Sequence, residues 1–174
     1  MSQATISFTA PVNGGSPITS YSASCTPGPI AAVSSASPIL VTNLSNGTAY
    51  TCSVTATNSF GSSVPSSPAS VMPRAVPGVP TLNTAEAGNS KVVITFTAPA
   101  SNGGVAITGY IASCGAIGIS GATSPITVIG LANSMAYSCS VAATNAAGTG
   151  LSSAAVSRTP RGPVIVPGTY LLDD

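Results

Sequence analysis

"SPILVTNLSNGTAYTCSVTATNSFG", residues 37–61, returns as "SPITVIGLANSMAYSCSVAATNAAG" at residues 124–148. Aligned residues in the two stretches lie 87 positions apart (124 − 37 = 87). An earlier stretch, residues 7–25, returns at residues 95–114, with an offset of 89 at its end (114 − 25 = 89). Repetition at a near-constant spacing indicates two homologous units in one chain of 174 residues. The drop of two in the offset predicts a longer intervening loop in the first copy.

Apolar and polar residues alternate over short runs in both copies. Tyr21–Cys25 and Tyr50–Ala56 show this period of two in the first copy. Clusters such as Asn13–Gly15 and Asn46–Gly47 separate the runs and are typical of turns. Alternation predicts strands with one buried face, and several such strands in about 90 residues predict a β-sandwich. The fold class expected from the sequence is therefore all-β.

Each copy carries two cysteines on the inward face of its predicted strands. Cys25 ends one strand and Cys52 lies near the start of a later one, and Cys114 and Cys139 repeat this arrangement. If the two strands are antiparallel neighbours, the sulfurs face each other. We therefore predict two disulfides, closing loops of 27 and 25 residues (52 − 25 and 139 − 114), and an oxidising compartment. The alternative is two pairs of buried reduced thiols that pack as small hydrophobes.

The charge content excludes several classes of function. The chain has four Lys and Arg, three Asp and Glu, a net charge of +1 and no His. So few cations predict no nucleic-acid partner. Without His there is no Ser–His or Cys–His nucleophile and no His-ligated metal, and we predict a non-enzyme without cofactor or metal. No apolar run is long enough to predict a membrane span, and residues 1–3 lack the start of a signal peptide.

Both units resemble fibronectin type III domains, in particular those found in tandem in bacterial secreted and surface proteins. The matching positions are a core aromatic of the second strand, a tyrosine of the third strand, and the leucine-to-tyrosine spacing before the sixth strand: Phe8 and Phe96, Tyr21 and Tyr110, Leu44 with Tyr50, and Leu131 with Tyr137. The resemblance implies two tandem immunoglobulin-like β-sandwiches, each with a tyrosine-corner hydrogen bond. It also implies a role as spacer, adhesive module or scaffold.

The two copies differ at their beginnings. Residues 77–88 of the second copy, "PGVPTLNTAEAG", supply a first strand that has no counterpart in the first copy. The first sandwich is therefore predicted to lack its first strand. The expected domains are residues 1–74 and 75–161, followed by a tail at 162–174.

The tail repeats the beginning of the second copy. Val166-Pro167-Gly168 corresponds to Val76-Pro77-Gly78, and Leu172 corresponds to Leu82, 90 residues earlier (172 − 82 = 90). We predict that this tail is a donor strand that completes the first sandwich of a second copy. A piece of a longer array of domains would have the same two ends, and the sequence leaves this alternative open. The predicted donor residues are Val164, Ile165, Val166, Tyr170, Leu171 and Leu172, and the predicted acceptor residues are Thr5, Ile6, Ser7 and Phe8.

The function expected from these features is that of a non-catalytic, secreted or cell-surface module with a structural or adhesive role. Head-to-tail strand addition would make it a subunit of a filament or surface array. The alternative is a spacer or accessory module of a larger secreted enzyme, such as a polysaccharide hydrolase. The expected partners are other copies of the chain or neighbouring domains. No residue identifies a surface polysaccharide or a protein as ligand.

Overall fold

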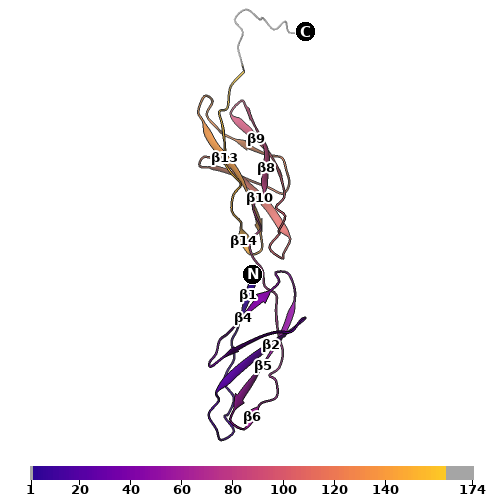
Figure 1. Cartoon of the computed structure of the whole chain (residues 1–174). Coiled ribbons are helices and arrows are strands. Elements are labelled where there is room, and N and C mark those ends of the chain that lie inside the picture. The colour runs from indigo at the N-terminus through magenta and orange to yellow at the C-terminus, as the bar shows by residue number, and fades with distance from the viewer. Residues whose placement is uncertain (1, 164–174) are drawn as a thin grey trace, which may run out of the picture. The chain divides into compact units, whose positions relative to one another are not determined.

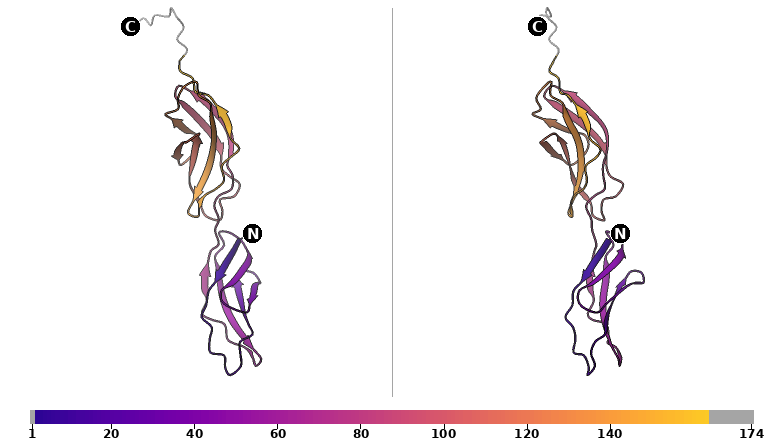
Figure 2. Two further views of the ribbon diagram at one scale, coloured as in Figure 1. Left: turned by 90° about the vertical axis from the view of Figure 1, so that its left-hand side faces the viewer. Right: turned by 60° about the vertical axis from the view of Figure 1, so that its left-hand side comes forward.

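The computed structural model describes residues 2–163, in which all regular elements are β-strands (Figures 1 and 2). The described residues divide into two compact units. Unit 1 comprises residues 2–75 with 103–106, and unit 2 comprises residues 76–102 with 107–163. The predicted all-β fold of two fibronectin type III-like sandwiches is confirmed.

Unit 1 consists of two antiparallel sheets. The first sheet contains β1 (Ser2–Ile6) and β4 (Ile39–Leu44). The second has the order β3-β2-β5-β6, with β7 also paired to β5. Its strands are β2 (Ser20–Thr26), β3 (Ile30–Ser34), β5 (Tyr50–Asn58), β6 (Gly61–Ser62) and β7 (Ala69–Val71). The alternating inward residues of both sheets form one apolar core.

Unit 2 has the same arrangement with one additional strand. Its first sheet has the order β12-β9-β8, and its second has the order β11-β10-β13-β14, with β15 also paired to β13. The strands are β8 (Thr81–Gly88), β9 (Lys91–Thr97), β10 (Ile107–Cys114), β11 (Ile117–Gly121), β12 (Ile126–Ile129), β13 (Tyr137–Asn145), β14 (Gly148–Thr149) and β15 (Val156–Arg158). The inward residues of these strands again form a single core.

The additional strand of unit 2 is β8, which covers one edge of β9. β9 pairs with β12 on one side and with β8 on the other. In unit 1 the corresponding strand β1 pairs with β4 alone among the described residues (Figure 1). Within residues 2–163, unit 1 thus has no strand that corresponds to β8, as predicted.

The extra length of the first copy lies in the hairpin between β2 and β3. The last pair before this turn is Cys25–Ile30 in unit 1 and Cys114–Ile117 in unit 2. Four residues therefore form the turn in unit 1 and two form it in unit 2. The shift of two in the repeat offset is thus absorbed in a surface turn, where an insertion leaves the strand register unchanged.

Both predicted cysteine pairs form disulfides between neighbouring antiparallel strands. The sulfurs of Cys25 and Cys52 are 1.99 Å apart, and those of Cys114 and Cys139 are 2.03 Å apart. Neither pair consists of reduced thiols, and no cysteine of the chain is free. Each pair stands directly opposite in register, β2 to β5 and β10 to β13.

The backbone of β5 explains why this position suits a disulfide. The N–H and C=O of Ala56 bond to Ser63, on the side of β5 away from β2. Because backbone groups alternate sides along a strand, Cys52 also faces away from β2, and Cys25–Cys52 is a non-hydrogen-bonded pair. Such pairs bring opposite Cα atoms closest, and here the Cα atoms are 4.1 Å apart.

The tyrosine-corner hydrogen bond implied by the resemblance is present in both units. The backbone N–H of Ser45 donates to the Tyr50 hydroxyl at 3.0 Å, and that of Ala132 donates to the Tyr137 hydroxyl at 2.9 Å. The Tyr50 side chain is buried, whereas that of Tyr137 is half-buried. Each bond fixes the loop that enters the long central strand.

Removing the Tyr50 hydroxyl is expected to destabilise unit 1. Tyr50→Phe removes a hydroxyl that is part of a buried side chain and accepts from the Ser45 N–H, which costs about 1 kcal/mol of unfolding free energy. Tyr137→Phe is the matched variant in unit 2, and its cost should be smaller because the Tyr137 side chain is only half-buried and its hydrogen bond is exposed to water. Urea unfolding followed by amide NMR signals of each unit measures both values. An equal cost in both units would contradict this reasoning.

Candidate functional site

The open edge of β1 is the main difference between the units and the candidate functional site. The Phe8 N–H donates to the Ser37 hydroxyl at 3.0 Å, and Ser37 lies just before β4. Backbone groups alternate sides along a strand. Ile6 therefore faces β4 as Phe8 does, and Thr5 and Ser7 present their N–H and C=O groups to the open edge. Both of these side chains are exposed.

The core beneath this edge is less covered than in unit 2. By the repeat, Ile6 corresponds to Ile94 and Phe8 to Phe96 (94 − 6 = 96 − 8 = 88). Ile94 is fully buried and Phe96 is 6% exposed, with Leu82 of β8 paired to Phe96. In unit 1, where the described residues supply no such strand, Ile6 and Phe8 are only partly buried. An added strand would remove this apolar surface from water.

The aromatic pair near this edge has nearly the same geometry in both units. The rings of Phe8 and Tyr21 have centroids 4.7 Å apart with planes tilted by 51°. Those of Phe96 and Tyr110 are 4.6 Å apart and tilted by 49°. The contact between these two rings therefore does not account for the difference in burial of Phe8 and Phe96.

The structure places the predicted acceptor residues at this edge. Thr5 and Ile6 belong to β1, and Ser7 and Phe8 follow it directly. The predicted donor residues lie outside the described residues, so that the pairing of donor and acceptor stays a prediction. These residues are Val164, Ile165, Val166, Tyr170, Leu171 and Leu172.

Two adjoining pockets extend from this edge across the loops of unit 1. They have volumes of about 460 Å³ and about 270 Å³. Pro11, Ala56 and Ser63 line both, so we treat the two as one site, the unit 1 pocket. Its walls include two highly exposed apolar side chains, Val12 (95%) and Phe60 (81%).

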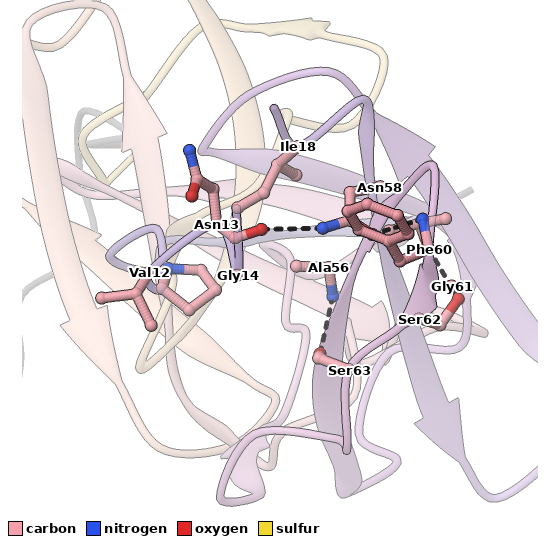
Figure 3. A pocket seen from close by; sticks show the side chains of 12 residues that line it. Val12, Asn13, Gly14, Ile18, Ala56, Asn58, Phe60, Gly61, Ser62 and Ser63 are labelled. Carbon is pink, nitrogen blue, oxygen red and sulfur yellow. Dashed lines mark hydrogen bonds between the residues drawn. The ribbon is translucent and has the colours of Figure 1, made fainter. Parts of the chain in front are cut away.

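Hydrogen bonds fix the loops around the larger pocket. Figure 3 shows the Asn58 side-chain amide donating to the Asn13 carbonyl, at 2.7 Å. The Ser16 and Ser59 hydroxyls bond to each other at 2.8 Å. No local pattern in the sequence indicates this pocket, because its walls come from two segments that are more than 30 residues apart (54 − 21 = 33). The repetition of Val76-Pro77-Gly78 as Val166-Pro167-Gly168 is the sequence signal that could have indicated it.

The described residues carry no arrangement suited to a metal ion. Within residues 2–163 there is no group of three His, Cys, Asp or Glu side chains that could hold one. The same residues contain no helix long and apolar enough to cross a membrane.

Comparison with known proteins bears on the family. Residues 1–72 match the family model described as the fibronectin type III domain. Unit 1 is therefore similar to the fibronectin type III domain, over less than half of the chain of 174 residues. The match covers unit 1, and the internal repeat relates unit 2 to this fibronectin type III unit. No curated protein matches the chain.

Among solved structures, the crystal structure of the chicken CNTN1 FN1–FN3 domains is similar to this chain. The alignment has 17% sequence identity and a TM-score of 0.46, and it covers 91% of this chain. The chain spans 62% of the length of that structure.

Proposed function

We propose that this chain is a non-catalytic extracellular structural module whose copies join head to tail by β-strand addition. The observation that carries this proposal is the open edge of β1. The core residues Ile6 and Phe8 at this edge are partly buried, whereas β8 covers their counterparts in unit 2. The match to the fibronectin type III domain supports a non-catalytic role, since such domains are generally structural modules. In this proposal residues 1–74 and 75–161 are the two domains, and residues 162–174 are the donor strand.

The disulfides support a location outside the cell. Stable disulfides form in oxidising compartments, and both units contain one in the core. We therefore propose that the chain is secreted, and its resemblance to tandem domains of bacterial surface proteins favours a structural or adhesive role at the cell surface.

The composition of the edge supports strand addition. Exposed sheet edges are normally protected by Lys, Pro or inward-pointing charges. β1, with the sequence SQATI, has none of these. Only 4% of the residues of the whole chain are charged, so that copies of the chain repel one another little.

Thr5→Pro tests the acceptor edge. This substitution removes an N–H that faces the open edge, while the bonds from β1 to β4 use the neighbouring residues. Edge strands tolerate proline at such positions, so that the fold of unit 1 should persist. We expect the full chain to form concentration-dependent oligomers in sedimentation under non-reducing conditions, and Thr5→Pro to abolish them.

Thr5→Ala is the matched control, because it keeps the N–H and should keep assembly. A full chain that stays monomeric at all concentrations would overturn the proposal and favour the spacer or accessory function. Assembly that survives Thr5→Pro would exclude β1 as the acceptor.

Two adjacent leucines test the donor strand. Leu172 corresponds to Leu82, which pairs with Phe96 in unit 2, and the repeat therefore places Leu172 opposite Phe8. Leu171 corresponds to Thr81, which is exposed. Leu172→Asp should therefore abolish assembly, whereas Leu171→Asp should preserve it. Equal effects of the two substitutions would contradict this register.

A further inference from the structure

In unit 2 the segment that precedes β8 packs against β14 and the residues after it. Pro77 is buried and Pro80 is fully buried. A Cβ built on Gly150 would clash with the Pro77 carbonyl oxygen, and one built on Gly148 would lie 3.4 Å from Val76. These approaches show that residues 76–78 lie directly on the Gly148–Gly150 backbone.

A second contact fixes the other side of this segment. The Gly78 N–H donates to the Ser101 carbonyl at 2.8 Å, and a Cβ on Gly78 would lie 3.5 Å from Pro99. The segment therefore lies between the loop after β9 and the loop after β13, where it leads into the first strand.

The same location in unit 1 is the unit 1 pocket. The repeat relates Gly148 to Gly61 and Gly150 to Ser63 (148 − 61 = 150 − 63 = 87). The backbone confirms this relation, since Gly150 N–H donates to the Ala143 carbonyl at 2.9 Å and Ser63 N–H donates to the Ala56 carbonyl at 2.8 Å. Pro99 likewise corresponds to Pro11 (99 − 11 = 88). The counterparts Gly61, Ser63 and Pro11 all line the pocket.

The inward residues of β5, which line the pocket, are more exposed than their counterparts in β13 of unit 2. Val141 and Ala143 of β13 are 0% exposed, whereas their counterparts Val54 and Ala56 of β5 are each 8% exposed. Val54 and Ala56 both line the pocket. The unit 1 pocket is thus the counterpart of the space that residues 76–80 occupy in unit 2, and no segment within residues 2–163 fills it.

We infer that the unit 1 pocket binds the Val166-Pro167-Gly168 segment from the tail of a second copy. This inference rests on the proposed function. It adds the unit 1 pocket to the β1 edge as a second place where two copies make contact. Val166-Pro167-Gly168 repeats Val76-Pro77-Gly78, and Leu172 follows Pro167 at the distance at which Leu82 follows Pro77. One tail can therefore occupy the pocket and the β1 edge together, as residues 76–88 do in unit 2.

Ser63 makes this binding differ in detail from its counterpart in unit 2. At Gly150 there is no side chain, and a Cβ there would clash with the Pro77 carbonyl. Ser63 carries a Cβ at that position, so that the incoming proline must lie farther from β5, where the pocket has room. Ser63→Gly should therefore strengthen the binding of the segment. Because it also removes the hydroxyl that accepts from the Ala56 N–H, Ser63→Ala, which removes the hydroxyl and keeps the Cβ, is the matched control and should not strengthen binding.

The test is an NMR titration of the isotope-labelled full chain with a synthetic peptide of residues 163–170, which lacks Leu171 and Leu172. The labelled chain carries Pro167→Asp, so that its own tail does not compete. We expect amide shifts at Gly61, Ser63 and Val64. The unit 2 counterparts of these residues should not shift, because residues 76–80 already occupy that site. The same peptide with Pro167→Ala should bind more weakly, and Ser63→Gly in the chain should lower Kd by roughly fivefold or more.

Absence of shifts in unit 1, equal shifts in both units, or an unchanged Kd with Ser63→Gly would overturn the inference. Sedimentation of the unsubstituted chain distinguishes a failure of the pocket inference from a failure of the proposed function. Assembly that depends on Leu172 without peptide shifts would overturn the pocket alone. Peptide shifts without assembly would overturn head-to-tail joining and leave the pocket as a site for a Val-Pro-Gly segment.

Discussion

Replacing Ile94 by alanine is expected to destabilise unit 2 by about 4 kcal/mol, whereas Ile6→Ala should destabilise unit 1 by about 2 kcal/mol or less. The two isoleucines occupy equivalent positions of β9 and β1. Ile94 is fully buried beneath β8, while Ile6 is only partly buried. A large-to-small substitution costs most where neighbouring residues enclose the cavity that it leaves. The difference between the two costs therefore measures the contribution of the covering strand.

Urea unfolding monitored by separate amide signals of the two units provides both free energies in one chain. The experiment should be run at low and at high protein concentration. In the dilute sample the two costs should differ, and under assembling conditions the cost of Ile6→Ala should rise toward that of Ile94→Ala. Equal costs in the dilute sample would show that the edge of β1 is covered without a second copy.

Removal of the unit 2 disulfide is expected to lower the unfolding free energy of unit 2 by about 3–4 kcal/mol. The bond between Cys114 and Cys139 closes a loop of 25 residues, and without it the unfolded chain gains the corresponding conformational freedom. Both sulfurs are fully buried, so that Cys→Ala at both positions also removes a small amount of core packing. The double variant avoids a lone reactive thiol.

The matched variant in unit 1, Cys25→Ala with Cys52→Ala, should have a similar cost because its loop of 27 residues is nearly the same length. Each pair should affect its own unit, since each bond lies within one core. Unfolding of each variant is compared with that of the parent chain under non-reducing conditions. A loss below about 1 kcal/mol would contradict the loop-entropy argument.

Much of the fold could be predicted because the relevant information is local and is repeated. The alternation from Tyr50 to Ala56 identifies a half-buried strand by itself, and the second copy confirms it at the same spacing. The disulfides could also be predicted, since Cys25 and Cys52 occupy the same face and opposite ends of their strands. The missing first strand followed from comparing residues 77–88 with the start of the chain.

The candidate site depends on more than local sequence. By itself the sequence determined the two sandwiches, their disulfides and the lack of a counterpart of residues 77–88 in the first copy, because strand periodicity and repeat spacing are properties of the chain alone. Only the tertiary structure decided that the backbone N–H and C=O of Thr5 point to the edge of β1 away from β4. It also decided that Gly61 and Ser63 line one pocket. Both facts depend on which segment lies across from which, since a pocket wall is formed where distant loops meet and not by any one stretch of sequence.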